Sequence, residues 1–388
     1  MRKYINSKSV MAVIFLFILS FFFIMNLNSV YPLVKNEVKA IIFSEYRDAL
    51  LSPQNIENAY NENFYGKLDF VDINGVVHKA MGQKLVNGAI KAENGKLFLD
   101  DDKNFVFDRK KEAVNVENAK EILEAADDIG ATTLYVQRPH KFIDAKDKLP
   151  YGMNIEFNKQ YDFWCENIKD SGENIIDLRK AISSDLDFYV TDHHWTVESS
   201  FYATKSIIEK LNLIDPTLHL DESLYDEGNY SIVKYKDSFL GSEGVKTGKY
   251  YVGKDDFNIL IPRFSTNLEY KHYINNEITL SKNGVFTNTF IDNSILENDD
   301  YYNKYNACLY GGYVENIVKN LNCKNGKKVL LISDSFARPM TMYLSMAFEE
   351  IHYLDPQEGR YNDSYIKYIE EYRPDIVIMM YTGEFQQI

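Results

Sequence analysis

The stretch that decides the fold is VLLISDSFARPM, residues 329–340. It opens with four branched apolar residues, a composition typical of a strand buried on both faces of a parallel sheet. Asp334, Ser335 and Phe336 interrupt the run, and Pro339 then suits the first turn of a helix beginning near Ala337. A strand, a short turn and a helix in this order predict an α/β fold.

The segments around this stretch repeat the alternation. Apolar spacing and end signals predict helices over 115–130, 156–172, 196–212, 337–350 and 363–372. Runs rich in branched residues predict strands over 132–138, 174–178, 327–333, 351–354 and 375–381. We therefore predict an α/β architecture with a parallel sheet flanked by helices on both faces.

Two regions depart from this alternation. Asn-Gly pairs between apolar runs predict hairpins over 70–83 and 86–99. A turn-rich, Tyr-rich stretch, about 213–300, predicts an insertion containing strands. The expected organisation is a basic tail 1–8, a membrane segment 9–27, a stalk 28–68 and one domain 69–388 that includes the insertion.

The N-terminus predicts a membrane anchor. No charged residue occurs from Ser9 to Val34, and Arg2, Lys3 and Lys8 precede this run. About 20 apolar residues of helix cross a bilayer, and the basic flank stays cytoplasmic. The rest of the chain is then expected outside the cytoplasm. A cleaved signal peptide is the alternative, and a buried core helix fits less well because the run has no polar face.

Composition narrows the function classes. The 388 residues are 45% hydrophobic and 14% aromatic, enough for a large core. The formal charge of −14 argues against nucleic acid and other anionic polymers as partners. The three cysteines, Cys165, Cys308 and Cys323, lack metal-binding spacing; a Cys308–Cys323 disulfide and free thiols both stay open.

A second motif, TDHHWT, spans residues 191–196. Asp192 and His194 are two positions apart, so an extended or loop segment directs both side chains to one face, with His193 pointing away. Trp195 would pack this loop against the body of the domain. An imidazole held by a carboxylate is the group that a serine nucleophile requires.

Ser335 supplies that nucleophile if the strand and helix form as predicted. Ligand sites in α/β sheets gather at the carboxyl ends of the strands, where helix N–H groups stabilise an oxyanion. The simpler alternative is that Ser335 only caps the helix. Taken together, the two motifs predict a triad of Ser335, His194 and Asp192.

Two metal-dependent roles for the histidine pair require residues that the chain lacks. A two-metal phosphoesterase site needs further Asp- and His-rich motifs that the chain lacks, and a zinc palmitoyltransferase needs a cysteine where Trp195 stands. Both histidines could also be structural. We expect no metal and no cofactor.

The two motifs in this order resemble the SGNH-hydrolase-like domains of alginate O-acetyltransferase proteins, and the DHHW string resembles the bacterial family named after it. Such domains carry Asp-x-His-Trp before Gly-Asp-Ser, which is the order found here. The segments YVQRPHKFIDAKDKLP and FLGSEGVKTG fit the family more loosely. Ser333 departs from the family glycine and would place a side chain beside the nucleophile.

The resemblance implies that Ser335, His194 and Asp192 are catalytic, with His193 and Trp195 as motif support. It also implies a polysaccharide acceptor and a membrane-bound O-acyltransferase that supplies acetyl groups. Further residues follow strands at the same sheet edge and are weaker candidates for lining the site: Ser333, Asp334, Arg360, Tyr381, Glu384, Arg138 and His140.

The function predicted from these observations is extracytoplasmic O-acetylation of a cell-surface or exopolysaccharide. Two alternatives stay open. A carbohydrate esterase would use the same triad with water as acceptor, and a non-catalytic accessory protein would bind the polymer or the acyltransferase.

Overall fold

The computed structural model describes residues 7–43, 63–100, 105–144, 156–298 and 301–388. The chain divides into two compact units, Met1–Val77 and His78–Ile388, and each is described by itself.

The first unit is dominated by one apolar helix, α1 (Ser7–Phe43). Its window Val10–Leu27 has a mean hydropathy of 2.7 and is 6% buried, and within the described residues it alone is long and apolar enough to cross a membrane. The predicted membrane segment 9–27 lies within α1, which continues into the predicted stalk. Residues 1–6 of the predicted tail and 44–62 of the stalk lie outside the described residues.

The predicted hairpin over 70–83 is wrong, because helix α4 (Lys67–Ala80) occupies this segment. Phe70, Ile73 and Val77 recur at helical spacing. This periodicity outweighs the turn signal of Asn74-Gly75, since an isolated glycine weakens a helix without preventing it.

The second unit alternates strands and helices as predicted, with shorter elements. Its helices are α5 (Arg109–Asp128), α6 (Phe157–Asp170), α7 (Leu178–Ala181), α8 (Val197–Ile214), α9 (Ser242–Thr247), α10 (Phe286–Phe290), α11 (Asn293–Leu296), α12 (Ala337–Leu344) and α13 (Tyr365–Tyr372). Its strands are β1 (Leu85–Val86), β2 (Ala89–Lys91), β3 (Leu97–Leu99), β4 (Thr132–Gln137), β5 (Ile175–Asp177), β6 (Tyr230–Phe239), β7 (Asp255–Pro262), β8 (Leu268–Ile274), β9 (Glu277–Gly284), β10 (Glu315–Asn320), β11 (Lys328–Ser333), β12 (Glu350–Leu354) and β13 (Ile376–Met380).

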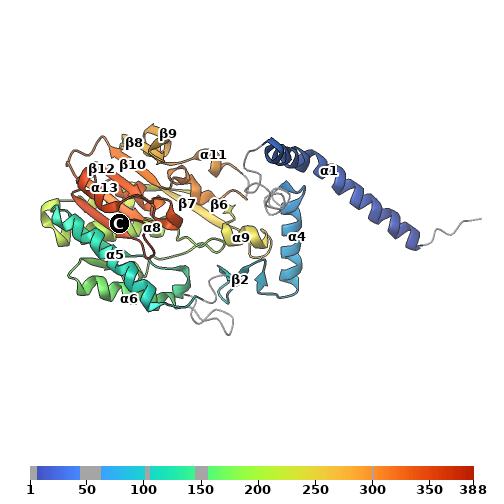
Figure 1. Ribbon diagram of the computed structural model, residues 1–388, viewed down its shortest axis with the longest axis horizontal. Helices are drawn as coiled ribbons and strands as arrows, with labels where there is room; N and C mark the ends of the chain where they lie inside the picture. The colour runs from blue at the N-terminus through green and yellow to red at the C-terminus, as the bar shows by residue number, and fades with distance from the viewer. Residues whose placement is uncertain (1–6, 44–62, 101–104, 145–155, 299–300) are drawn as a thin grey trace, which may run out of the picture. The chain divides into compact units, whose positions relative to one another are not determined.

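The main sheet has the strand order β5-β4-β13-β11-β12-β10-β8-β9. Figure 1 labels β12, β10, β8 and β9 at one end of this sheet. The first five strands pair in parallel. The other three are antiparallel and extend the sheet beyond β12. The expectation of a purely parallel sheet is therefore corrected to a mixed one, since β8 and β9, which fall in the predicted insertion, pair onto the sheet through β10.

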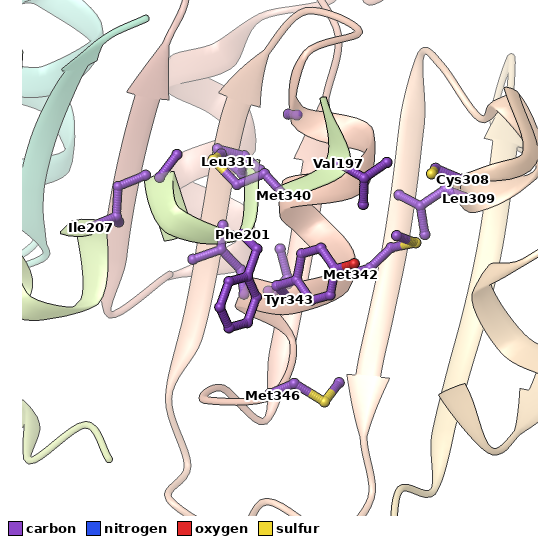
Figure 2. Packing of buried hydrophobic residues seen from close by; sticks show 14 of the residues in the cluster. Val197, Phe201, Ile207, Cys308, Leu309, Leu331, Met340, Met342, Tyr343 and Met346 are labelled. Carbon is purple, nitrogen blue, oxygen red and sulfur yellow. The ribbon is translucent and has the colours of Figure 1, made fainter. Parts of the chain in front are cut away.

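Both faces of β4, β11, β12 and β13 are buried, as their continuous apolar runs predict. Val329 and Leu331 of β11 face a core that includes α8 and α12, whereas Leu330 and Ile332 face α5 and α13. Figure 2 shows the first core, where Phe201 of α8 meets Tyr343 of α12 edge to face at 5.3 Å between ring centroids. The nucleophile strand is thereby fixed between two packed layers.

Some predictions about single turns, helix ends and cysteines are confirmed, and others are wrong. The hairpin over 86–99 is confirmed as β1, β2 and β3, and Asn87 and Gly88 take the positive φ angles that a tight hairpin turn requires. Thr196 caps α8, as predicted, by accepting from the N–H of Ser199. The helix predicted to reach residue 350 ends at Leu344. Cys308 and Cys323 are both free thiols, so no disulfide joins them.

Candidate active site

Ser335 lies in the turn between β11 and α12, at the carboxyl edge of the parallel strands. The residue that caps α12 is Phe336, so the simpler hypothesis that Ser335 only caps the helix is not supported. The N–H groups that follow are already paired: Phe336 donates to Asp334 Oδ1 at 3.1 Å, Ala337 to the Asp334 carbonyl and Arg338 to the Ser335 carbonyl. Among the described residues, no acceptor pairs with the N–H of Ser335 itself.

Asp334 fixes this turn to the neighbouring strands. Its Oδ2 accepts from Arg138 Nε at 2.9 Å and from a terminal guanidinium nitrogen at 2.7 Å. The guanidinium also lies 4.2 Å from the centroid of the Phe336 ring. The Tyr353 hydroxyl donates to the Asp334 carbonyl at 2.8 Å. The turn is thus held by side chains from β12 and from the loop after β4.

The Ser333 side chain, predicted to lie beside the nucleophile, is hydrogen-bonded to the neighbouring strand. It is fully buried, and its hydroxyl donates to the Met380 carbonyl of the adjacent β13 at 2.9 Å. The Ser333 hydroxyl is therefore used within the sheet.

The TDHHWT segment brings an acid and a base to the serine. The His194 Nδ1 lies 2.5 Å from Asp192 Oδ1, and its Nε2 lies 2.8 Å from Ser335 Oγ across a sequence separation of 141 residues. Asp192 Oδ1 also accepts from the backbone N–H of His194, so the local conformation is a tight turn. With Nδ1 donating to the carboxylate, Nε2 is free to accept the serine proton.

Burial controls the charge state of this trio. Asp192 is 0%, His194 4% and Ser335 7% exposed. Removal from water, aided by the nearby His193, lowers the pKa of His194 to about 3, against the opposing effect of Asp192. Burial alone would raise the pKa of Asp192, but the two histidines and hydrogen bonds hold it well below its usual value. The resting pair is therefore a carboxylate beside a neutral imidazole.

Loop 240–244 and Asp255 hold the acid in place. Asp192 Oδ2 accepts from the N–H of Ser242 at 2.9 Å. The backbone approaches so closely here that a Cβ on Gly241 would lie 2.2 Å from the Asp192 Cβ. The Asp255 carboxylate accepts from the N–H groups of Val190 and Thr191 and from the Thr191 hydroxyl.

A buried lysine supports the same loop from behind. Lys141 is 2% exposed, and its Nζ donates to the carbonyls of Asp192 at 2.8 Å and Val190 at 3.2 Å. Glu243, 1% exposed, is the acid whose charge acts most strongly on Lys141. Burial raises the pKa of Glu243 to about 8, and burial lowers the pKa of Lys141.

Aromatic rings enclose the imidazole of His194. Tyr305 stacks on it at 3.9 Å between centroids and 15° between planes. His193 lies 3.9 Å away at 36°, so the expectation that it points away from the site is wrong. Trp195 is fully buried and donates from Nε1 to the Phe336 carbonyl.

Three of the weaker candidates, Arg360, Tyr381 and His140, have their described partners outside the nucleophile turn. Arg360 pairs with Asp355 at 2.9 Å, and the Tyr381 hydroxyl donates to the Glu384 carbonyl at 3.4 Å. The ring of His140 packs against the rings of Phe142 and Phe157. Of Arg138, His140, Arg360 and Tyr381, only Arg138 is hydrogen-bonded to the nucleophile turn within the described residues.

A metal could in principle use Asp192, His193 and His194, whose ligand atoms lie within 4.8 Å of one another. The donor set fits poorly, because both ring nitrogens of His194 are already engaged, one by the carboxylate and one by Ser335. A bound ion would have to break one of these hydrogen bonds.

Sequence reasoning missed Tyr305, Asp255 and the support given by Lys141 and Glu243. The segments YVQRPHKFIDAKDKLP and FLGSEGVKTG contain Lys141 and Gly241. Their loose resemblance to the family was the only signal in the sequence for these two regions. Tyr305 and Asp255 lie in the turn-rich stretch and carry no local motif.

Comparisons with known proteins agree with this geometry. Residues 90–237 match the family described as SGNH hydrolase-like domain, acetyltransferase AlgX; the match includes Asp192 and His194 and ends before Ser335. The comparison with curated proteins finds no match.

Solved structures share the fold. Bacillus cereus PatB1, determined with a sulfonyl adduct, superposes with a TM-score of 0.59 at 15% identity, covering 74% of this chain and 96% of its own. A DHHW family protein from Eubacterium siraeum gives 0.55 at 16% identity, covering 77% and 94%. The resemblance predicted from the two motifs is confirmed: residues 90–237 match the SGNH hydrolase-like family, and the chain shares the fold of these solved structures.

Proposed function

We propose that this protein is an extracytoplasmic O-acetyltransferase that modifies a polysaccharide through Asp192, His194 and Ser335. The observation that carries the proposal is the continuous hydrogen-bonded path from carboxylate to imidazole to serine hydroxyl. The match to an acetyltransferase family supports acyl transfer as the reaction class.

In the first half-reaction, His194 Nε2 accepts the proton of Ser335 Oγ as the oxygen attacks an acetyl carbonyl. The unpaired N–H of Ser335 is a donor for the developing oxyanion. When the tetrahedral intermediate collapses, His194 returns the proton to the leaving group, and an acetyl ester remains on Ser335.

In the second half-reaction, a sugar hydroxyl gives its proton to His194 Nε2 and attacks the acetyl ester. Collapse releases the O-acetylated sugar, and the proton returns to Ser335 Oγ. Water in place of the sugar would give hydrolysis, which is the esterase alternative.

The apolar helix supports a location outside the cytoplasm, anchored by residues 9–27. Because acetyl-CoA is cytosolic, the acetyl donor would come through a membrane-bound O-acyltransferase, as the family resemblance implies. The charge of −14 favours a neutral glycan over an anionic one. Alkaline extraction of membranes, followed by mass measurement of the protein, distinguishes a retained anchor from a cleaved signal sequence.

The test uses the full-length protein in detergent, as wild type, Ser335→Ala and His194→Ala. Each is mixed with p-nitrophenyl acetate and neutral oligosaccharides, and ester release and oligosaccharide mass are followed. Sugar acetylation that both variants lose supports the transferase. Ester release without sugar acetylation supports the esterase. A Ser335→Ala variant that still sustains polymer acetylation in cells supports the accessory role.

A further inference from the structure

His193 differs from Asp192, His194 and Ser335 because its side chain is open to solvent. Its side chain is 40% exposed, compared with 5% for His194 and 0% for Asp192. Its ring nevertheless lies 3.9 Å from the His194 ring between centroids. It is therefore an exposed imidazole directly beside the base of the proposed triad.

A second hydrogen-bonded path leads to this exposed ring. His193 Nδ1 lies 3.1 Å from Ser242 Oγ, and Ser242 Oγ donates to Glu243 Oε2 at 3.3 Å. Because the Ser242 proton is directed to Glu243, the Ser242 oxygen accepts from Nδ1–H of His193. This arrangement selects the His193 tautomer whose Nε2 carries a lone pair.

The ring is neutral, as that tautomer requires. Partial removal from water and the positive charges of Lys141 and Arg138 lower the pKa of His193, against the opposing effect of Asp192. Within the described chain, no protein group is hydrogen-bonded to Nε2. The site thus holds a second imidazole acceptor next to the first, and the proposed reaction through Ser335 gives it no task.

We propose that His193 Nε2 binds the hydroxyl group of the carbohydrate acceptor and orients it towards the acetyl ester on Ser335. This inference rests on the proposed function and names the group that favours sugar over water. The acceptor offers a hydroxyl next to the one that reacts, as vicinal hydroxyls of a pyranose do. His193 accepts a hydrogen bond from the neighbouring hydroxyl, while the reacting hydroxyl gives its proton to His194, so no proton moves to His193.

The experiment measures how the acetyl-enzyme partitions between sugar and water. Full-length wild type, His193→Phe and His193→Gln are given p-nitrophenyl acetate with cellopentaose or chitopentaose, and acetylated sugar and free acetate are counted. His193→Phe keeps a ring beside His194 and removes the acceptor nitrogen. We expect its sugar-to-acetate ratio to fall about tenfold, the effect of losing one hydrogen bond in the transition state. His193→Gln places an amide oxygen near the same point and should recover part of the ratio.

Ester release without sugar separates this inference from the function on which it rests. Ser335→Ala should lose p-nitrophenol release, whereas His193→Phe keeps the nucleophile and the base and should still release it, at a rate altered by the change beside the His194 ring. The sugar-to-acetate ratio does not depend on that rate, because both products arise from the same acetyl-enzyme. If His193→Phe slows release and sugar acetylation equally, the ratio is unchanged and His193 only packs against His194, which overturns the inference. A wild type that releases acetate and acetylates neither glycan overturns it too, while the loss in Ser335→Ala would still support the triad.

Discussion

The two arms of the candidate site are built in different ways. Ser335 is carried by regular structure, a strand buried on both faces followed by a helix. Asp192 and His194 lie in a loop without helix or strand, fixed by the isolated bridge between Phe188 and Trp195 and by side chains from distant segments. The nucleophile is positioned by backbone packing, and the acid–base pair by side-chain hydrogen bonds.

This difference predicts where the site is vulnerable. Substitutions near Ser335 should affect chemistry or the whole core. Substitutions in the supports of the acid–base loop should affect activity more than folding, because they shift a short segment.

The largest effect is expected from removing the nucleophile. Ser335→Ala should lower the rate of ester release by about 10⁴-fold, as loss of a triad member does. Its thermal midpoint should stay close to that of the wild type, because the change removes only one hydroxyl. A variant with near-normal ester release would assign the chemistry to another residue.

Gly241→Ala tests the closest contact with the acid. The new Cβ would lie 2.2 Å from the Asp192 Cβ, so the loop must move and the Asp192–His194 hydrogen bond with it. Ester release should fall about 100-fold, since small displacements of catalytic groups are costly. Gly228→Ala is the matched control, because a Cβ there meets nothing within 4 Å. Equal activity in the two variants would mean that the loop tolerates displacement.

Lys141→Met tests the support behind the loop. It removes the donor to the Asp192 and Val190 carbonyls. The Val190 carbonyl keeps the N–H of Leu97, whereas the buried Asp192 carbonyl loses its donor, at a cost of about 1–3 kcal/mol. Activity should fall about tenfold, together with the midpoint of urea unfolding. Adding Glu243→Gln should recover stability if the lysine charge also compensates Glu243. No recovery would limit the role of Lys141 to its hydrogen bonds.

The smallest effect is expected on pH dependence. The folded pKa of His194, about 3, lies below the ordinary value near 6.5. Ester release should therefore persist well below pH 6.5 and decline only as pH approaches the folded value. Over the same window, stability should decrease as pH falls, because the unfolded state binds a proton that the folded state excludes.

Tyr305→Leu opens one face of the His194 ring to water. Weaker desolvation should raise the pKa of His194 and move the acid limb of the rate profile upwards by about one pH unit. Tyr310→Leu serves as a control, since Tyr310 is partly buried on the same segment and has no ring contact with His194 among the described residues. An acid limb that does not move would show that Tyr305 contributes little to the low pKa.

Local sequence was enough wherever a short segment specifies its own structure. Branched apolar residues over 329–332 predicted the central strand, Thr196 the start of α8, and Asn87-Gly88 a hairpin turn. The same reasoning failed over 70–83, where helical spacing outweighed an Asn-Gly turn signal. It also failed for His193, whose neighbours come from a loop about 50 positions away.

The sequence by itself determined the α/β class, the apolar helix and the three residues proposed as a triad, because each is encoded in a run of a few residues. Only the tertiary structure decided which groups surround them. Tyr305, Asp255, Lys141 and Gly241 reach the acid–base loop from separate parts of the chain. Their contacts depend on how strands and loops pack together, and no local periodicity records that packing.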